Sequence, residues 1–318
     1  MNKNAKIYVA GHRGMVGSAV VRRLQAEGYT NVVTRTHAEL DLTRQDQVEA
    51  FFDAERPDAV IFAAAKVGGI LANDTYRAEF IYQNTIMAAN VIHSAWKYGV
   101  SKLINLGSSC IYPKHAPQPL KEEYLLTGPL EPTNEPYAIA KISAIKMCRS
   151  YYEQYGCNFF SLMPSNLYGP GDNFDLETSH VLPALIRKVA DANAKGASEV
   201  VVWGDGSPLR EFLFVHDLAD AVVFALQNLA GDEVEKVTAD RFLNVGSGIE
   251  VSIADLAKLI CREVDCNARL TFDTSKPNGT PRKVMDSSKM NELGWTAGTS
   301  LEEGIRETVQ WYLHNQVE

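Results

Sequence analysis

Two side chains capable of proton transfer lie four residues apart, in the run Tyr137-Ala138-Ile139-Ala140-Lys141. If this segment is helical, a phenol and an ammonium group share one face, one turn apart. A phenol with an ordinary pKa of about 10 exchanges protons poorly at neutral pH, whereas a nearby cation favours its phenolate form. The pair therefore suggests acid–base chemistry in a redox reaction, although such a pair is simply exposed on many helices.

A serine with a complementary role follows the predicted strand Lys102–Leu106, in the run Gly107-Ser108-Ser109. Ligands of parallel α/β sheets bind at the carboxyl ends of the strands, so Ser108 is expected beside the Tyr137/Lys141 helix. Its hydroxyl can donate to a substrate carbonyl and stabilise an oxyanion. Ser108, Tyr137 and Lys141 are our first candidate catalytic residues.

Three glycines follow the first predicted strand, in the run Gly11-His12-Arg13-Gly14-Met15-Val16-Gly17. A glycine turn before a helix lets backbone N–H groups and the helix N-terminus approach a pyrophosphate. The spacing is G-x-x-G-x-x-G, and many ordinary strand-to-helix turns carry similar glycines. Because the loop follows the first strand of the chain, we interpret it as a dinucleotide site. The predicted contacts are Gly11, Arg13, Gly14, Met15 and Gly17.

The end of the second predicted strand bears on the choice of dinucleotide. An NAD-binding protein usually places Asp or Glu there for the ribose 2′-OH, whereas this chain has Arg35. Arg35 and Arg13 can both reach a 2′-phosphate, which favours NADP (NADPH) over NAD. Arg35 could instead be a solvated charge at the strand end. Asp41 and Leu42 are candidates to flank the adenine ring.

The elements around these residues alternate short apolar runs with amphipathic stretches, as in βαβ units. Strands are predicted at Ile7–Ala10, Asn31–Thr34, Ala59–Ala64, Lys102–Leu106 and Asn158–Met163. Helices are predicted at Ser18–Glu27, Gln45–Glu55, Asn84–Tyr98 and Tyr137–Tyr155. The pattern predicts an α/β protein with a Rossmann-type, doubly wound parallel sheet.

The pattern changes after Pro164, where short strands (Val200–Trp203, Leu270–Asp273) mix with helices and turn-rich runs. A helix at Phe214–Asn228 and a strand at Phe242–Val245 are expected to return to the large sheet. We therefore predict an NADP-binding domain from residues 1–165 with about 214–246. Residues 166–213 and 247–318 are predicted to form a smaller C-terminal, substrate-binding α/β lobe.

The composition of the 318 residues is that of a globular protein, with 46% hydrophobic and 22% charged residues. A formal net charge of −8 disfavours nucleic acids and acidic membranes as partners. We expect neither a secretory leader nor a membrane span, because no long apolar stretch occurs. Five scattered cysteines without a C-x-x-C motif suggest neither a disulfide framework nor a metal site, and a cytoplasmic location is expected.

Together these segments resemble the extended short-chain dehydrogenase/reductase superfamily over nearly the whole chain. The matching pieces are Gly11–Gly17, Asp41-Leu42, Ala63-Ala64-Ala65, Ser108, Tyr137/Lys141, Pro164–Pro170, Arg210-Glu211-Phe212 and His216-Asp217. The resemblance implies a nucleotide-sugar substrate whose keto group binds Ser108, a proton exchanged by Tyr137, and a cofactor ribose held by Lys141. It adds five cofactor contacts: Ala64, Pro164, Asn166, Leu167 and His180.

Longer strings resemble one branch of this superfamily, the 3,5-epimerase/4-reductases that convert GDP-4-keto-6-deoxy-D-mannose to GDP-L-fucose. The strings are residues 11–17, 63–70, 107–113, 131–141 and 279–283. The resemblance implies that protons at C3 and C5, both next to the C4 ketone, are removed and returned on the opposite face. NADPH then reduces C4.

Inversion needs a second acid/base group, because a single base returns the proton to the face from which it came. Cys110 and His180 match the epimerisation pair of that family. A thiol and an imidazole, with ordinary pKa values of about 8.5 and 6.5, both exchange protons at neutral pH. Without the resemblance, Cys110 would be interpreted as a packing residue and His180 as a helix-start or surface histidine.

A nucleoside diphosphate requires cations and a flat surface. Besides Ser108, the candidate substrate contacts are Asn166, Lys188, Trp203, Arg210 and Lys283. Arg210 matches a substrate arginine of the superfamily, whereas Lys188 could be a solvated helix charge and Trp203 a core residue. The chain departs from the family at Lys188, where Arg is frequent, and at His37, where a second 2′-phosphate arginine can stand.

Two other functions remain open at this point. Another nucleotide-sugar epimerase or reductase would use a UDP- or dTDP-sugar, and a simple 4-epimerase would not need Cys110. A non-catalytic NADP-binding sensor would be expected to lack part of the Ser/Tyr/Lys set, which is intact here. The superfamily also implies a homodimer formed through the helices predicted at Asn84–Tyr98 and Tyr137–Tyr155.

Overall fold

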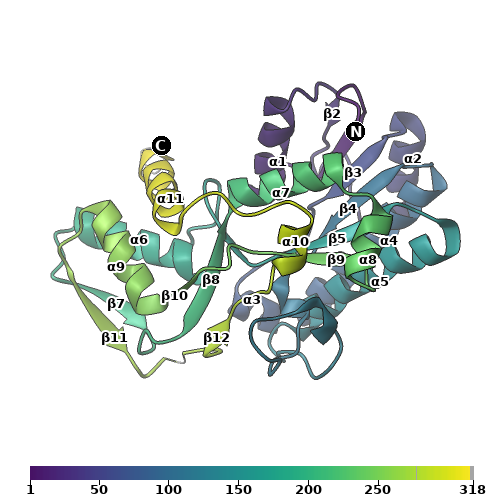
Figure 1. The fold of residues 1–318 in the computed structure, drawn as a ribbon. Coiled ribbons are helices and arrows are strands. Elements are labelled where there is room, and N and C mark those ends of the chain that lie inside the picture. Colours follow the sequence, from purple (N-terminus) through teal and green to yellow (C-terminus); the bar gives the residue numbers. More distant parts are fainter. Residues whose placement is uncertain (277, 316–318) are drawn as a thin grey trace.

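The computed structural model describes residues 1–276 and 278–315 and has two lobes of unequal size (Figure 1). The larger lobe contains a six-stranded sheet, ordered β2-β1-β3-β4-β5-β9, in which all neighbours are parallel. The strands are β1 Ile7–Ala10, β2 Val32–Val33, β3 Ala59–Phe62, β4 Lys102–Leu106, β5 Phe159–Pro164 and β9 Phe242–Val245. Because β2 and β3 lie on opposite sides of β1, the sheet is doubly wound about a switch point at β1 and β3. The predicted fold class is confirmed.

Helices cover both faces of this sheet, which explains why all its strands except β2 are buried along their whole length. One face packs against α1 (Met15–Ala26) and α7 (Val215–Asn228), and the other against α2 (Gln45–Glu55), α4 (Arg77–Lys97) and α5 (Glu135–Tyr155). Side chains of β1 alternate between the two cores: Ile7 and Val9 join the first, and Tyr8 and Ala10 the second.

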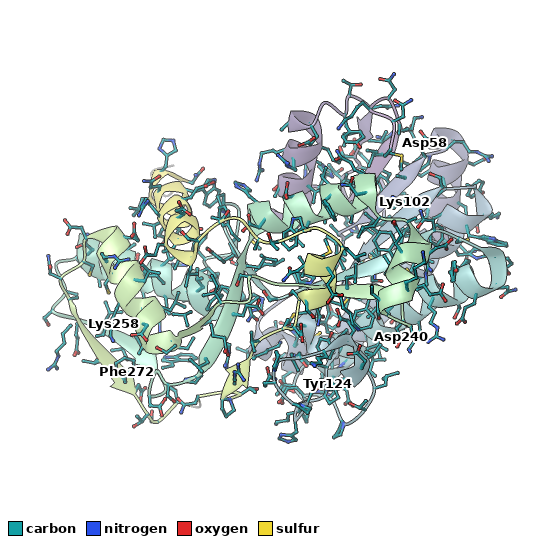
Figure 2. The ribbon with its side chains drawn as sticks, viewed as in Figure 1. Asp58, Lys102, Tyr124, Asp240, Lys258 and Phe272 are labelled. Atoms are coloured by element: carbon teal, nitrogen blue, oxygen red, sulfur yellow. The ribbon has the colours of Figure 1, made fainter. Side chains whose placement is uncertain are left out.

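The smaller lobe has its own core between three helices and a pair of parallel strands (Figure 1). The helices are α6 (Val181–Ala194), α9 (Ile253–Val264) and α11 (Leu301–Asn315), and the strands are β7 (Glu199–Trp203) and β11 (Arg269–Asp273). Figure 2 labels Lys258 and Phe272 in this lobe and Lys102 and Asp240 in the larger one. None of the helices in the described part of the chain is long and apolar enough to cross a bilayer.

A third group of short strands lies where the lobes meet. Strand β8 (Leu209–Phe214) pairs with β10 (Glu250–Ser252), β12 (Arg282–Lys283) and β6 (Asn166–Tyr168). The remaining short helices are α3 (Ile70–Thr75), α8 (Gly231–Val237), α10 (Ser288–Glu292) and two 3-10 turns, Ser109–Ile111 and Glu122–Tyr124.

Most predicted elements agree with the structure to within one or two residues, but two differences are informative. Helix α4 begins seven residues earlier than predicted, because its first turns combine the buried Phe80 with the exposed Ile81 and Tyr82 and lack the apolar periodicity. Within the predicted substrate lobe 247–318, Met290 and Trp295 pack instead on the core of the large sheet. The Trp295 indole also donates to Asp220 at 3.0 Å, which corrects the predicted boundary locally. Pro277 and residues 316–318 of that range lie outside the described residues.

Candidate active site

The glycine loop joins β1 to α1 and brings the backbone close to the segment that follows β3. Gly11 has φ of +86°, and a Cβ there would lie 2.7 Å from the amide nitrogen of Ala64. A Cβ on Gly17 would lie 2.2 Å from the carbonyl oxygen of Gly11. Helix α1 begins after Gly14 with no side-chain cap and no acidic residue in its first turn. Its N–H groups therefore suit a pyrophosphate.

The two candidate 2′-phosphate arginines act on the same carboxylate. Hydrogen bonds from Thr36, followed by the charges of Arg35 and Arg13, lower the pKa of Glu39. Arg13 is exposed, whereas Arg35 forms an ion pair with Glu55. A 2′-phosphate at this position would therefore compete with Glu55 for the Arg35 guanidinium.

Four candidate catalytic side chains gather at the carboxyl end of β4. Ser108 begins the turn Ser109–Ile111, and its hydroxyl oxygen accepts from the backbone N–H of Cys110 at 3.4 Å. Lys141 is buried on α5 and donates from Nζ to the Leu106 carbonyl at 2.9 Å. The same nitrogen lies 5.7 Å from the centre of the Tyr137 ring.

Burial dominates the acid–base properties of these groups. It raises the pKa of Tyr137 far above its ordinary value, with a smaller increase from Cys110. It lowers the pKa of Lys141 to about 8. Burial also raises the pKa of Cys110, partly offset by the Ser108 hydroxyl and by Lys283. Burial therefore opposes the expected shift of the phenol toward its phenolate form, and Tyr137 and Cys110 are both protonated at neutral pH.

His180 reaches the same region from the smaller lobe. It precedes α6, in a loop tied to the segment after β3 by a hydrogen bond from the Gly69 N–H to the Thr178 carbonyl at 3.0 Å. The residue is exposed at the surface, but many protein atoms surround its imidazole. The resulting desolvation, together with the charge of Lys283, lowers the pKa of His180. The imidazole is therefore neutral at pH 7 and can accept a proton. The charge of Lys283 acts on both His180 and Cys110.

Two cations lie side by side where the lobes meet. Arg210 on β8 and Lys283 on β12 are direct partners in the parallel register of these strands. Burial lowers the pKa of each. Among residues 1–276 and 278–315, neither has a carboxylate within ion-pair distance. Adjacent cations without an anionic partner suit a diphosphate.

Trp203 and Lys188 lie together at the end of β7. The indole is 60% exposed, so the alternative interpretation as a core residue is wrong. The ammonium groups of Lys188 and Lys276 lie 5.0 and 5.5 Å from its ring centre. Lys188 also donates to the Val201 carbonyl at 3.3 Å. An exposed aromatic face between cations could cover a base.

Other predicted contacts carry structural bonds. The Asn166 side chain donates to the Glu211 carbonyl at 2.8 Å, so its amide nitrogen links β6 to β8. The Asp41 carboxylate accepts from the Thr43 N–H at 2.9 Å, and Leu42 is buried. Pro164 ends β5 at the carboxyl edge of the large sheet, and Leu167 lies in β6, which follows directly.

Sequence reasoning missed two residues of α4 that support the site. Buried Asn84 accepts from the Lys66 N–H at 2.9 Å and donates to the Lys66 carbonyl at 3.0 Å, which fixes the segment after β3. The Phe80 ring packs edge-on against Tyr137, with centres 6.2 Å apart. An asparagine among apolar residues of a predicted helix was the available signal, because buried amides need partners.

The class of protein follows from where the Tyr137/Lys141 helix and the glycine loop meet. Both reach the carboxyl edge of one doubly wound sheet, the arrangement of extended short-chain dehydrogenase/reductases. The chain belongs to the NAD dependent epimerase/dehydratase family, whose model matches residues 7–246.

Relatives with closely similar sequences are GDP-L-fucose synthases. The chain is 59% identical to "Putative GDP-L-fucose synthase 2" of Arabidopsis thaliana over 318 residues, covering 100% of this chain and 94% of the relative. It is 51% identical to "GDP-L-fucose synthase" of Escherichia coli strain K12 over 313 residues, covering 98% and 97%. The solved structure of a GDP-L-fucose synthetase from Naegleria fowleri bound to NADP is similar with a TM-score of 0.91, 32% identity, and coverage of 100% and 95%.

Proposed function

We propose that this chain is a bifunctional 3,5-epimerase and NADPH-dependent 4-reductase that converts GDP-4-keto-6-deoxy-D-mannose to GDP-L-fucose. The observation that carries the proposal is the gathering of Ser108, Cys110 and Tyr137 at one strand end, with the charge of Lys283 acting on both Cys110 and His180. The names and full-length similarity of the relatives support the same substrate.

NADP(H) fits the region around the switch point, because the glycines allow close approach and α1 begins without a side-chain cap. Gly11, Gly14, Met15 and Gly17 would hold the pyrophosphate, Arg13 and Arg35 the 2′-phosphate, and Lys141 the ribose. The other proposed contacts are Asp41, Leu42, Ala64, Pro164, Asn166, Leu167 and His180. When bound, NADPH supplies the hydride that reduces the C4 ketone.

Epimerisation requires that the enolate oxygen be stabilised while protons leave C3 and C5. The Ser108 and Tyr137 hydroxyls donate to the C4 oxygen, so that negative charge at this atom meets donors already in place. His180, kept neutral by its lowered pKa, accepts a proton, and Cys110, kept a thiol by its raised pKa, donates one. Two groups on different elements can serve opposite faces of the sugar.

Reduction uses the same donors. Tyr137 gives its proton to the alkoxide that forms at C4, and the Lys141 ammonium one turn away stabilises the phenolate left behind. Arg210 and Lys283 hold the diphosphate, while Trp203, Lys188 and Asn166 contact the nucleoside and sugar. In this assignment most cofactor contacts lie in residues 1–165 with 214–246, and the diphosphate and nucleoside contacts lie in 166–213 with 247–318.

We also propose a cytoplasmic homodimer assembled through α4 and α5. These helices pack against each other, and α4 exposes Ile81 and Tyr82 while α5 exposes Ile139. Exposed apolar side chains on two neighbouring helices suit a helical interface with a second copy. Light scattering after gel filtration tests this, since a dimer has twice the 35.1 kDa of the chain. A monomer at micromolar concentration would contradict it.

The direct test of the reaction is product analysis in D2O. With GDP-4-keto-6-deoxy-D-mannose and NADPH, the protein should give GDP-L-fucose with deuterium at C3 and C5. A product reduced at C4 without inversion at C3 and C5 would make it a reductase alone. Binding of NADPH without any product would favour the sensor alternative.

A further inference from the structure

Glu211 is a fully buried carboxylate beside the candidate diphosphate cations, and the proposed reaction does not use it. It is 0% exposed and follows Arg210 on β8. Because successive side chains of a strand face opposite sides, Glu211 lies on the other face of β8 from Arg210. A buried carboxylate is costly unless it is well hydrogen-bonded, so its partners indicate why it is there.

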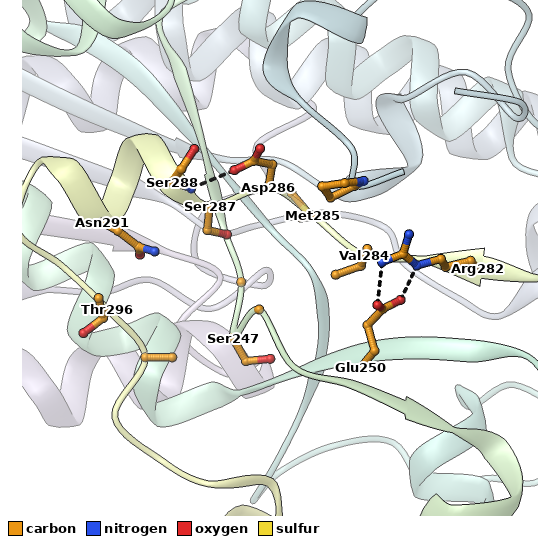
Figure 3. A pocket seen from close by; sticks show the side chains of 14 residues that line it. Ser247, Glu250, Arg282, Val284, Met285, Asp286, Ser287, Ser288, Asn291 and Thr296 are labelled. Carbon is orange, nitrogen blue, oxygen red and sulfur yellow. Dashed lines mark hydrogen bonds and ion pairs between the residues drawn. The ribbon is translucent and has the colours of Figure 1, made fainter. Parts of the chain in front are cut away.

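The carboxylate accepts backbone hydrogen bonds from two distant segments. Oε1 accepts from the Gly248 N–H at 2.7 Å, and Oε2 accepts from the Met285 N–H at 2.8 Å. The N–H of Ser247 also donates to this group. Gly248 belongs to the turn after β9, and Met285 follows Lys283 by two residues. Figure 3 shows Ser247 and Met285 on neighbouring segments around one cavity of about 450 Å³.

The position of the Glu211 carboxylate is tightly defined by its surroundings. Its own carbonyl accepts from Asn166, which ties this point of β8 to β6. A Cβ added at Gly246 would lie 2.2 Å from Glu211 Oε1, so the backbone of the turn after β9 closes over the carboxylate. The turn after β9 and the segment after β12 therefore meet at this side chain, and β6 is tied to its backbone.

The strand that carries Lys283 is short, so hydrogen bonds at its two ends help to hold it in place. Strand β12 has two residues, of which Lys283 pairs with Arg210. At its start, the Leu209 N–H donates to the Pro281 carbonyl at 2.9 Å, and past its end Met285 donates to Glu211. Among the described residues, no hydrogen bond or ion pair joins the Glu211 carboxylate directly to Lys283. The contact between them runs through the backbone of Met285.

We propose that Glu211 is a positioning residue for the substrate diphosphate, because its carboxylate fixes the backbone of Gly248 and Met285 and thereby keeps Lys283 beside Arg210. This inference rests on the proposed function, in which Arg210 and Lys283 bind the diphosphate. Both carboxylate oxygens accept backbone hydrogen bonds. A glutamine would turn an NH2 group toward one backbone N–H and leave that buried donor unpaired.

The test measures binding of GDP and NADPH to Glu211→Gln, together with its kinetics on the nucleotide sugar. GDP should bind about tenfold more weakly, and KM should rise by a similar factor, as expected when one buried donor loses its partner. The value of kcat should stay within about threefold, and NADPH affinity should not change, because Asn166 bonds to the main-chain carbonyl of residue 211, which Glu211→Gln retains. Unchanged GDP affinity would overturn the inference.

A double-mutant comparison separates positioning from a general structural effect. In a Lys283→Ala background, Glu211→Gln should weaken GDP binding by less than about twofold, because residues that act through one another are not additive. An equal loss in both backgrounds would overturn the inference. Glu302→Gln, the same change at an exposed ion pair with Arg262, is the control and should leave GDP affinity unchanged.

Two further measurements keep the inference testable if Glu211→Gln does not fold. Gly246→Ala should weaken GDP binding in the same way, because it displaces the carboxylate without removing its charge. In the wild-type protein, the Met285 amide should be strongly protected from hydrogen exchange, and rapid exchange would contradict the bond to Glu211. A wild-type protein that binds no GDP would count against the proposed function itself, whereas normal wild-type binding with unaffected variants counts only against Glu211.

Discussion

The ammonium nitrogen of Lys141 lies 5.7 Å from the centre of the Tyr137 ring, one helical turn away on α5. Lys141 is held there by its bond to the Leu106 carbonyl at the end of β4. The pair thus connects the helix to the strand end that carries Ser108. Burial keeps Tyr137 protonated, which is the state needed to donate a proton to a developing alkoxide.

Removing the Tyr137 hydroxyl should abolish most of the reduction. Tyr137→Phe is expected to lower kcat for NADPH oxidation by about 100-fold or more, because the alkoxide loses its proton donor. Isothermal titration with NADPH should show unchanged affinity, since the phenyl ring still packs against Phe80. Reduction at more than a tenth of the wild-type rate would mean that another group protonates C4.

Cys110→Ala should act mainly on epimerisation. Its thiol is protonated at neutral pH and supplies the proton that His180 does not, so its removal should lower inversion at C3 and C5 by about 100-fold. NADPH affinity should be unchanged. Cys148→Ala is a matched control, because this cysteine is also buried but packs in the core between the sheet and the helices α2, α4 and α5. Inversion of both carbons at the wild-type rate in Cys110→Ala would remove Cys110 from the mechanism.

The pKa of Lys141 predicts how cofactor binding depends on pH. At about 8 it lies below the ordinary value for lysine, so the ammonium is charged below pH 8 and loses its charge above it. If Lys141 holds the ribose as a cation, the Kd for NADPH should rise between pH 7.5 and 9.5 in the wild type. Lys141→Met should bind NADPH with a larger Kd that does not depend on pH over this range. If the Kd of the variant rises with pH as it does in the wild type, a group other than Lys141 causes the pH dependence.

Arg13 and Arg35 should decide between NADPH and NADH. Arg13→Ala and Arg35→Ala are each expected to raise the Kd for NADPH by about tenfold, because a charge-assisted bond to the 2′-phosphate is lost. The Kd for NADH should change little. Arg44→Ala removes an exposed arginine that pairs with Asp46, and serves as the control. Equal weakening of both cofactors would mean that these arginines act on loop structure instead.

Much of the fold could be predicted from the sequence, because local patterns decide it. The strands of the parallel sheet are mostly apolar, and the glycines of the first loop are required where Gly11 and Gly17 approach neighbouring backbone. The start of α4 was missed because its first turns expose Ile81 and Tyr82 and bury only Phe80, which gives no clear apolar periodicity. The return of Trp295 to the large core was missed because it depends on contacts distant in the chain, such as that with Asp220.

The candidate site was predictable in its residue types but not in its contacts. Nothing near Arg35 in the sequence indicates the ion pair with Glu55, which lies twenty residues further on and on another element. The bond between Gly69 and Thr178 likewise joins two loops from different lobes. Glu211 lies next to Arg210 in a recognisable motif. The sequence still gives no sign that the Glu211 carboxylate accepts from the Gly248 and Met285 N–H groups. Such contacts are set by tertiary packing.

The central claim is the identity of the substrate, and NADPH oxidation with three nucleotide sugars tests it most directly. We predict rapid oxidation with GDP-4-keto-6-deoxy-D-mannose, and rates at least about 100-fold lower with the UDP and dTDP analogues at equal concentration. Oxidation with the UDP or dTDP sugar but not with the GDP sugar would contradict the account.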